Sequence, residues 1–476
     1  MPLTKSHPGR PLGPKTMDKN ELVQALTRIL GPEQVLFSET DLLVYSYDGS
    51  LHSALPDVVV LPRSTEEVSA IVALASKEGI PIVARGSGTN LSGGSIPLKG
   101  GIVIHFSRMN RILEIDVENQ RAVVETGVLN LDLQNALSPY GYYYAPDPAS
   151  QKVSTLGGNV AENAGGPHCL KYGVTTNHVV GAEIVLSNGE VLWIGGKAPD
   201  PLGYDLLGLF VGSEGTLGIA TKITVRIMKK PESVQTFLAI FNALEDAANT
   251  VSAIIGTGII PATLEMMDQT VIRAIEESIH AGYPLDAEAV LIIELDGLKD
   301  GMDRLAGRII EICRDNHVRE VKMATSEAEQ AKLWAGRKGA LGALARLRPN
   351  YLLEDGTVPR TELPGVLKRV VEIGEKHKLQ IGIFLHAGDG NLHPTILFDA
   401  THEEERQRVL RAGTEILKAC VDVGGTISGE HGIGVEKIHE MSLLFSQEEF
   451  ESMRHVKEAF DPQDLLNPGK VIPEDR

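Results

Sequence analysis

The chain has 476 residues, more than one hydrophobic core usually organises, so the sequence predicts two or three domains. An apolar fraction of 42% and a charged fraction of 23% are typical of a globular protein in water. The formal net charge of −18 argues against nucleic acid as a partner, because binding to phosphates requires a basic face.

The three cysteines, Cys169, Cys313 and Cys420, lie far apart and form no C-x-x-C pair. We therefore expect no disulfide framework and a location in the reducing cytosol. An iron–sulfur cluster held by this chain alone is excluded, since it would need about four thiolates. No apolar run reaches the ~18 residues of a membrane span, and association with a membrane through a partner stays open. Residues 1–17 are expected to be a disordered leader.

The first half of the chain predicts an α+β domain rich in antiparallel strands. Its periodicity indicates a helix from Asp18, a strand at Val58–Leu61, a helix capped by Ser64 and a strand at Ile80–Ala84 that opens into a glycine-rich loop. Short β-branched runs predict further strands at Ile102–His105, Ile112–Asp116, Ala122–Thr126, Glu183–Leu186, Val191–Ile194 and Lys222–Met228.

A domain boundary is predicted at Lys229-Lys230-Pro231, after which strands and helices alternate. The expected strands are Thr236–Phe241, Val290–Leu295 and Ile381–His386. Five helices are expected. One ends near Ile255, three cover Met302–His317, Ala328–Arg346 and Thr361–His377, and the last ends near Phe460.

Three glycine-rich stretches in the first half predict a phosphate-bearing ligand. Glycines let backbone N–H groups approach a pyrophosphate, and tight turns alone do not account for three such stretches. The spacing is not G-x-G-x-x-G and no long helix follows at once, which disfavours a Rossmann site. The candidate ligand residues are Arg85, Gly86, Ser87, Gly88, Thr89, Asn90, Gly93 and Gly94, then Pro146, Asp147, Ser154, Thr155, Gly157, Gly158, Asn159, Asn163, Gly165 and Gly166, then Gly212, Glu214, Gly215, Gly218 and Ile219.

Two histidines, His386 and His393, stand seven residues apart across a glycine-rich turn. A strand before and a strand after would bring both to one sheet edge, as in a hairpin. Further on, Glu430 precedes His431 in a second glycine-rich segment. Two histidines and a glutamate are a plausible set of ligands for a divalent metal with open positions. With fourteen histidines in the chain, a chance pair is the competing interpretation.

The three glycine-rich stretches resemble the FAD-binding domain of the vanillyl-alcohol-oxidase/PCMH flavoprotein superfamily, and the resemblance extends over most of the chain. It is closest to the branch of the glycolate oxidase D-subunit and D-lactate dehydrogenase. The resemblance implies an α+β fold with a PCMH-type FAD-binding domain at 18–230, a ferredoxin-like substrate or cap domain at 231–425, and a C-terminal helical segment at 426–476. That segment would return to the flavin through Asn467.

The resemblance also implies how FAD is held. The first stretch and Ser154–Asn159 would cradle the pyrophosphate, and the third stretch would line adenine and ribose. Some relatives attach FAD covalently through a histidine in the first stretch; Thr89 stands at that position here, which implies non-covalent FAD.

For the reaction, the resemblance assigns His386, His393 and Glu430 to a divalent metal (Zn, Fe or Mn), His431 to proton removal and Arg337 to the substrate carboxylate. It implies oxidation of a D-2-hydroxy acid. Relatives that act on D-2-hydroxyglutarate supply a lysine near Leu352 and an asparagine at the place of Thr395. Both differences favour a small monocarboxylate, glycolate or D-lactate, over D-2-hydroxyglutarate.

Electrons would pass to oxygen, a quinone or a partner protein, since relatives work beside an iron–sulfur subunit or an electron-transfer flavoprotein. Other chemistry on the same fold, alkyl transfer or alcohol oxidation, is an alternative that does not require the metal set and Arg337 together. A zinc hydrolase would leave the first-half loops unexplained. A non-catalytic flavin-binding or scaffold subunit is the remaining alternative.

Overall fold

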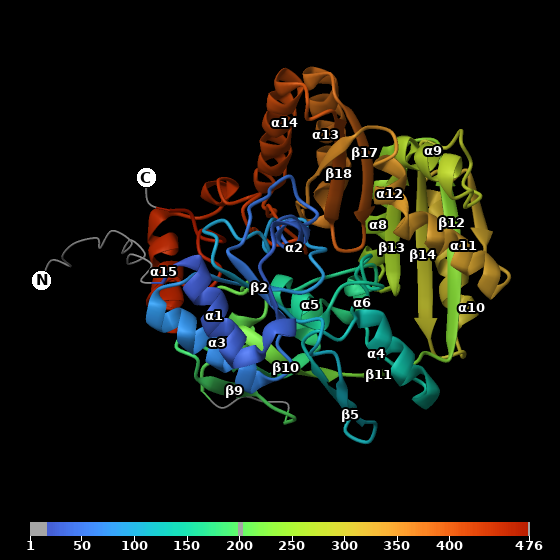
Figure 1. Cartoon of the computed structure of the whole chain (residues 1–476). Coiled ribbons are helices and arrows are strands. Elements are labelled where there is room, and N and C mark those ends of the chain that lie inside the picture. The colour runs from blue at the N-terminus through green and yellow to red at the C-terminus, as the bar shows by residue number, and fades with distance from the viewer. Residues whose placement is uncertain (1–16, 199–202, 475–476) are drawn as a thin grey trace, which may run out of the picture. The chain divides into compact units, whose positions relative to one another are not determined.

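The structure, a computed structural model, describes residues 17–198 and 203–474 (Figure 1). By their contacts the residues form two compact units. Of the described residues, the first unit comprises 17–164, 174–198, 203–229 and 431–474, and the second comprises Gly165–Gly173 and Lys230–Glu430. Apart from Met17, the expected leader lies outside the described residues.

A four-stranded sheet in the first unit ends in the first glycine-rich stretch. Its order is β1 (Val35–Leu36), β2 (Val58–Val60), β4 (Ile102–His105) and β3 (Ile82–Arg85), with β2, β4 and β3 parallel. Helices α1 (Lys19–Leu30) and α3 (Thr65–Glu78) contribute side chains to the same core as these strands. The predicted cap Ser64 is confirmed, because its side chain accepts a hydrogen bond from the first turn of α3, and Asp18 caps α1 in the same way.

A second, antiparallel sheet in the first unit has the order β5 (Ile112–Asp116), β6 (Arg121–Glu125), β10 (Ile219–Arg226), β8 (Val179–Val185) and β9 (Val191–Gly195). Helices α4 (Asn130–Leu137) and α5 (Leu156–Glu162) share its core. Helix α5 was not predicted, because glycine at two of its seven positions disfavours a helix in isolation. The remaining elements are α2 (Glu39–Val44), α7 (Leu206–Phe210) and the pair β7 (Tyr142–Tyr143) and β11 (Met228–Lys229).

The C-terminal segment belongs to the first unit. After α15 (Gln447–Phe460), Leu466 bridges Ile82 of β3 in parallel, and the Asn467 N–H donates to the Ile82 carbonyl oxygen at 2.7 Å. Residues at the end of the chain therefore lie beside the strand that leads into the first glycine-rich stretch.

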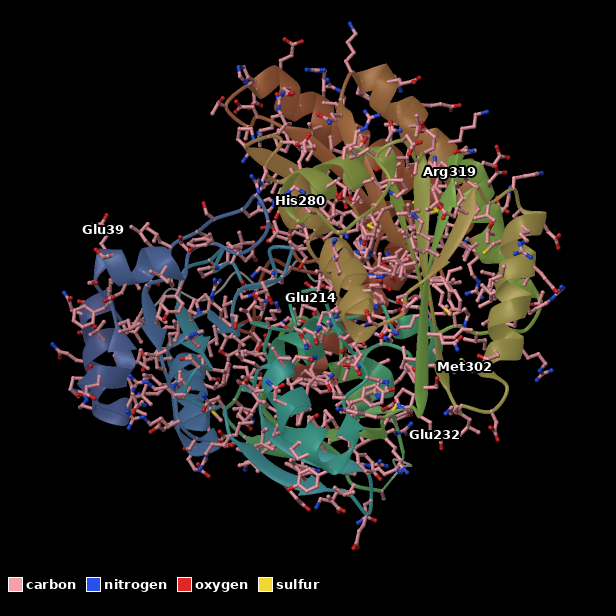
Figure 2. The ribbon with its side chains drawn as sticks, turned by 90° about the vertical axis from the view of Figure 1, so that its right-hand side faces the viewer. Glu39, Glu214, Glu232, His280, Met302 and Arg319 are labelled. Carbon is pink, nitrogen blue, oxygen red and sulfur yellow. The ribbon has the colours of Figure 1, made fainter. Side chains whose placement is uncertain are left out.

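The second unit is built on a seven-stranded antiparallel sheet of order β15-β12-β14-β13-β17-β18-β16. Figure 2 shows Glu232 and Met302 toward one end of this sheet and Arg319 toward the other. Helix α10 (Met302–Asp315), which begins at Met302 and ends shortly before Arg319, therefore runs along the length of the sheet. The strands are β12 (Ser233–Phe241), β13 (Thr263–Asp268), β14 (Ala289–Gly297), β15 (Glu320–Met323), β16 (Asn350–Leu353), β17 (Gln380–His386) and β18 (Asn391–Phe398). The helices are α6 (Cys169–Tyr172), α8 (Leu244–Gly256), α9 (Gln269–Ser278), α10 (Met302–Asp315), α11 (Glu327–Lys338), α12 (Ala340–Leu344), α13 (Leu363–His377) and α14 (Glu403–Val421).

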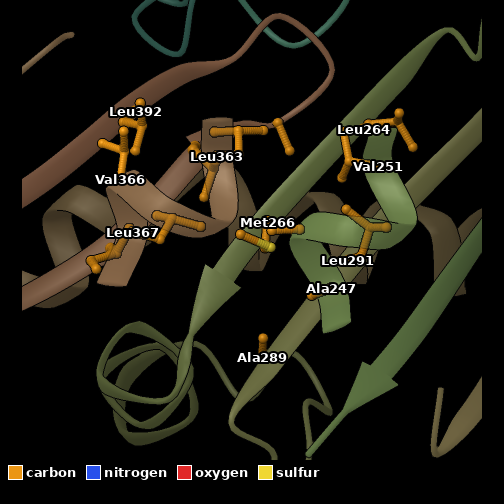
Figure 3. Packing of buried hydrophobic residues seen from close by; sticks show 14 of the residues in the cluster. Ala247, Val251, Leu264, Met266, Ala289, Leu291, Leu363, Val366, Leu367 and Leu392 are labelled. Carbon is orange, nitrogen blue, oxygen red and sulfur yellow. The ribbon is translucent and has the colours of Figure 1, made fainter. Parts of the chain in front are cut away.

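One face of this sheet packs against α8 and α13 (Figure 3). On β13, Leu264 and Met266 point into that core. Side chains alternate along a strand, so Glu265, which lies between them, projects from the opposite face. The same alternation on β17 sends Leu385 into the core and His386 to the face of Glu265.

One expectation for the second unit is wrong, and one long helix was not predicted. The single helix expected over Ala328–Arg346 is two helices, α11 and α12, which meet at Gly339. Gly339 lies against Ile279, so that a Cβ there would overlap the isoleucine side chain. The long helix α14 was not expected at all; it lies beside α13 (Figure 1), and its many charged residues obscure a buried stripe that includes Val409, Ile416 and Cys420.

Candidate functional site

The first and second glycine-rich stretches are in direct contact in the first unit. A Cβ on Gly86 would overlap the Thr155 hydroxyl, and a Cβ on Gly157 would overlap the Thr126 hydroxyl. Arg85, at the start of the first stretch, is 5% exposed. Its guanidinium donates to Ser95 Oγ at 3.0 Å and to the Tyr47 carbonyl oxygen at 2.6 Å. Residues Gly86–Gly94 and Ser154–Asn159 therefore form one cradle, in which Gly86 and Gly157 have no room for a Cβ.

The third stretch joins this cradle at the end of α5. Gly212, at φ +83°, donates its N–H to the Val160 carbonyl oxygen at 2.9 Å, and a Cβ on it would lie 3.2 Å from Asn163 Cβ. Glu214 N–H donates to the Ala161 carbonyl oxygen at 2.8 Å. The structure thus brings together the three stretches that the sequence singled out.

Buried polar atoms in the cradle fit a bound FAD. Ser154 Oγ, Asn159 Nδ2 and Ser213 Oγ are buried without a hydrogen-bond partner among residues 17–198 and 203–474. Burying such groups unpaired costs about 1–3 kcal/mol each. The oxygens of the FAD diphosphate and ribose would accept hydrogen bonds from these three groups. The same stretches contain Gly86 and Gly157, which have no room for a Cβ.

Glu214 and Asn467 use their side chains on the protein itself. The Glu214 carboxylate accepts the N–H groups of Ile433 and Gly434, each at 2.7 Å, and so holds the loop that follows His431. The Asn467 amide donates to the carbonyl oxygens of Gly94 and Glu214 at 2.8 and 2.7 Å. Both residues thereby tie the C-terminal segment to the glycine-rich stretches.

This part of the first unit holds an unusual concentration of buried charge. Burial raises the pKa of Glu214, while the two N–H donors act in the opposite direction. Burial and the neighbouring Glu214 raise the pKa of Glu162 well above its ordinary value. Burial lowers the pKa of Lys470 to about 7, although Glu214 and Asp48 favour its charged form.

In the second unit, the two histidines of the predicted metal set lie side by side. β17 and β18 form the expected hairpin, in which Phe384 is opposite His393, so His386 and His393 project from the same face. Their ring centroids are 5.0 Å apart and the rings are nearly perpendicular. Nε2 of each ring lies 3.1 Å from Oε1 of Glu430. All three potential ligand atoms fall within 4.8 Å of one another.

A second layer of residues surrounds this cluster. Glu265 is opposite His386 in the register of β13 and β17, and its Oε1 lies 2.8 Å from His386 Nδ1. Arg337 Nη2 lies 2.6 Å from the other oxygen of Glu265, and the Arg337 guanidinium packs over the Phe384 ring at 4.9 Å. The predicted substrate arginine is therefore buried and paired with a carboxylate.

Asp355 organises the segment that carries Glu430. Its Oδ2 accepts Ser428 Oγ–H at 2.7 Å and the N–H groups of Gly429 and Glu430 at 3.0 and 3.1 Å. Its Oδ1 accepts Asn391 Nδ2–H at 2.8 Å and lies 3.9 Å from His393 Nδ1. Glu265, Asp355 and Asn391 were not identified from the sequence. The one signal for Glu265 is a lone carboxylate within the apolar run Thr263–Met267.

The electrostatics of the cluster favour positive charge between the histidines and Glu430. Burial alone would lower the pKa of His386, but the Glu265 and Glu430 carboxylates outweigh it and raise that pKa to about 10. Burial would raise the pKa of Glu430, yet His386 and His393 hold it well below its ordinary value. Nitrogen and oxygen ligands with this preference fit a divalent ion.

The other predicted residues fall at several places. His431 directly follows Glu430 and begins the last segment of the first unit. Gly165 belongs to the second unit, where a Cβ on it would lie 2.5 Å from Glu430 Oε2, and Gly166 follows it. Pro146 accepts a hydrogen bond from Asn130 Nδ2 through its carbonyl oxygen. Gly218 and Ile219 begin β10.

The two departures from the pattern of D-2-hydroxyglutarate enzymes differ in position. Leu352 packs in the core on the face of α8 and α13, away from the histidines. Thr395 projects from the same face as His393, is fully buried and donates to the His393 carbonyl oxygen at 3.3 Å. Of the two positions, only Thr395 therefore shares a face of the sheet with His386 and His393.

Comparison with known families covers most of the chain. Residues 56–195 match the family model of the FAD binding domain, and residues 230–471 match that of FAD linked oxidases, C-terminal domain. The chain is 45% identical over 458 residues to the glycolate oxidase subunit GlcD of Escherichia coli (strain K12), covering 96% of this chain and 92% of that one. It is 46% identical to the glycolate oxidase subunit GlcD of Bacillus subtilis (strain 168), covering 96% and 98%. Identity to the D-lactate dehydrogenase of Archaeoglobus fulgidus is 35%, covering 87% and 91%.

Solved structures with the same fold are more distant in sequence. p-Cresol methylhydroxylase with bound substrate matches with a TM-score of 0.81 at 19% identity, covering 96% of this chain and 97% of that one. The 4-ethylphenol oxidase from Gulosibacter chungangensis matches with a TM-score of 0.79 at 23% identity, covering 96% and 98%.

Proposed function

Since the chain belongs to the FAD-linked oxidases, we propose that it oxidises a small D-2-hydroxy acid, glycolate or D-lactate, to the 2-oxo acid. The predicted family, the α+β PCMH-type fold, the FAD cofactor and the oxidoreductase class are confirmed. This family accounts for the glycine-rich stretches, which a zinc hydrolase would leave unexplained. The finer assignments below are proposals.

The observation that carries the proposal is the cluster of the buried His386 and His393 with the partly buried Glu430 in a chain that binds FAD. We propose that these three residues hold Zn, Fe or Mn. Such an ion would lower the pKa of a bound substrate hydroxyl. Neither a phenol oxidase nor an alkyl transferase requires this set, so it favours a hydroxy acid as substrate.

FAD is proposed to bind non-covalently along Gly86–Gly94, Ser154–Asn159 and Gly212–Gly218. Bound FAD would supply the two-electron acceptor for the hydride that leaves the substrate Cα. The lack of bulk at Gly86 and Gly157 and the unpaired atoms of Ser154 and Asn159 support this placement. Asn467 acts by holding the carbonyl oxygens of Gly94 and Glu214.

Two residues are proposed to act on the substrate directly. His431 removes the hydroxyl proton, a task suited to imidazole because its ordinary pKa lies near neutral pH. Arg337 binds the substrate carboxylate. Its Nε is buried and has no hydrogen-bond partner within the described part of the chain, which leaves a donor beside the ion pair with Glu265.

A partner protein or a quinone is proposed to receive the electrons. Similar proteins are named as a subunit of glycolate oxidase, and the three separated cysteines of this chain cannot hold an iron–sulfur cluster. Within residues 17–198 and 203–474, no helix combines the length and the apolar character needed to cross a bilayer. A cytoplasmic location, with any membrane contact made through the partner, is part of this proposal.

Substrate choice is tested by turnover with an artificial electron acceptor. We expect kcat/KM for glycolate or D-lactate to exceed that for L-lactate and for D-2-hydroxyglutarate. A preference for D-2-hydroxyglutarate would favour the second candidate, a D-2-hydroxyglutarate dehydrogenase, and would contradict the inference drawn from Thr395. Oxidation of a phenol or a simple alcohol, without any hydroxy acid, would contradict the proposal as a whole.

A further inference from the structure

Glu265 connects the two parts of the proposed site in the second unit. It is fully buried in the middle strand β13, between the core residues Leu264 and Met266. One carboxylate oxygen faces Nδ1 of His386 at 2.8 Å, and the other faces Nη2 of Arg337 at 2.6 Å. A metal ligand and the substrate arginine thus share one carboxylate.

His386 Nδ1 lies 2.8 Å from Glu265 Oε1 and 3.4 Å from Arg337 Nη2, so the carboxylate is its nearer partner. A carboxylate accepts hydrogen bonds, so it stabilises the tautomer that carries its proton on Nδ1. Nε2 of His386 then presents a lone pair toward Glu430, 3.1 Å away. Metal-binding histidines commonly donate their second ring N–H to a carboxylate in this way, and loss of that partner costs 10- to 100-fold in affinity or activity.

The charges of the buried cluster point in the same direction. Glu430, Glu265 and Asp355 supply three negative charges, and Arg337 supplies one positive charge. These groups lie in a region where side-chain exposure is at most 15%. A divalent cation between the Nε2 atoms would offset the excess of carboxylates, whose burial is costly.

We propose that Glu265 is a positioning residue that holds His386 with Nε2 toward the metal and couples this ligand to Arg337. This inference rests on the proposed function, because it assumes that His386, His393 and Glu430 bind a divalent ion. It goes further in assigning the tautomer of His386 and a shared support for metal and substrate carboxylate.

Replacement by glutamine makes the role measurable. A glutamate offers an acceptor to both neighbours, but a glutamine offers one oxygen and one NH2 group. The Arg337 guanidinium is always charged and lies 2.6 Å from Glu265 Oε2, so the glutamine oxygen would face Arg337 and its NH2 would face His386 Nδ1. His386 would then carry its proton on Nε2 and lose its lone pair toward the metal.

Glu294 on the neighbouring strand β14 provides a matched control. It too is a buried glutamate between a histidine and other donors, with Oε1 3.2 Å from His168 Nε2 and Oε2 accepting from Trp334 Nε1 at 2.8 Å. His168 is outside the proposed metal set. Glu294→Gln therefore repeats the chemical change in the same sheet without altering a metal ligand.

The experiment measures Zn²⁺ and Mn²⁺ affinity of the full FAD-loaded chain by competition with a chelator, and melting temperature after metal removal. For Glu265→Gln we expect a 10- to 100-fold larger Kd for the metal and a raised KM for the hydroxy acid. For Glu294→Gln we expect an unchanged Kd. If the two variants have lower melting temperatures but equal Kd values for the metal, Glu265 acts only on stability, and the proposal is contradicted.

The outcomes distinguish this inference from the proposed function. Wild-type protein that binds metal together with Glu265→Gln protein that binds it equally well would contradict the inference alone. Wild-type protein that binds neither ion would contradict both. If Glu265→Gln does not retain FAD, Glu265→Asp takes its place: it keeps the charge beside Arg337 but shortens the reach to His386, and unchanged metal affinity in that variant would likewise contradict the inference.

Discussion

Gly165 lies so close to Glu430 that a Cβ at this position would come within 2.5 Å of Glu430 Oε2. Glycine at position 165, which the sequence suggested as part of the flavin site, thus makes room for the carboxylate of the proposed metal set. The same Cβ would approach Cys169 Sγ at 3.3 Å, so neither side has space to give.

Gly165→Ala is therefore expected to displace the Glu430 carboxylate from the two histidines. Metal affinity should fall by about tenfold or more, while FAD content stays near that of the wild type. Gly342→Ala, in the short helix α12 where a Cβ meets nothing within 4 Å, is the control and should change neither quantity. Equal metal affinity of Gly165→Ala and wild type, determined by chelator competition, would show that Gly165 does not constrain Glu430.

FAD binding should depend on the contact between Gly86 and Thr155. A methyl group on Gly86 would overlap the Thr155 hydroxyl and force the first and second glycine-rich stretches apart. We expect Gly86→Ala to weaken FAD binding by about 2 kcal/mol or more, on the scale of overpacking in a close-packed site. The check is the FAD content after gel filtration and the Kd for added FAD. Gly196→Ala, where a Cβ has open space, should keep its flavin.

The stability of the second unit should depend on pH through Asp268. This residue caps α9 by accepting the Val271 N–H at 2.9 Å, and burial raises its pKa from 3.8 to about 7, with Glu288 contributing in the same direction. Between pH 4 and 7 the folded state holds a proton that the unfolded state has lost, so this group's contribution to stability declines as the pH rises through that window.

Asp268→Asn keeps an oxygen for the cap and removes the ionisation. The variant should gain about 1 kcal/mol relative to wild type at pH 8, allowing for partial exposure, and much less at pH 5. Urea unfolding at both pH values checks the sign. If Asp268→Asn raises the free energy of unfolding less at pH 8 than at pH 5, the raised pKa of Asp268 is contradicted.

Thiol reagents should distinguish Cys169 from the other two cysteines. Burial raises the pKa of Cys313 and Cys420 to about 12, and both are at most 1% exposed, so their thiolates are not available. Cys169 is partly exposed. Native protein should react with about one equivalent of reagent and denatured protein with about three. Cys169→Ser protein that still reacts at one native site would contradict this ranking.

The sequence predicted those parts of the site that are local in the chain. The spacing of His386 and His393 about a turn predicted a hairpin, because a strand before and a strand after leave little alternative. The glycine-rich stretches predicted a cradle because residues without side chains permit close contacts such as that of Gly86 with Thr155. Glu430 was proposed with the two histidines from its residue type, and the resemblance to a known family strengthened that assignment.

The residues that surround the proposed metal set could not be predicted, because they are far in the sequence from the residues they contact. Glu265 precedes His386 by 121 residues, and only the register of β13 and β17 places them opposite one another. Asp355 reaches the Glu430 segment from 75 residues away. Pairing between strands so far apart is decided by the packing of the whole sheet, which periodicity within one strand does not encode. Helix α14 was missed for a related reason: its stability comes from packing against α13.

The most direct test is the visible spectrum of the metal-replete, FAD-loaded protein without oxygen, recorded before and after addition of glycolate, D-lactate or L-lactate. We expect glycolate or D-lactate to bleach the oxidised-flavin band near ~450 nm, L-lactate to bleach it less, and removal of the metal to slow the bleaching. An oxidised-flavin band that none of these acids bleaches would contradict the proposed reaction.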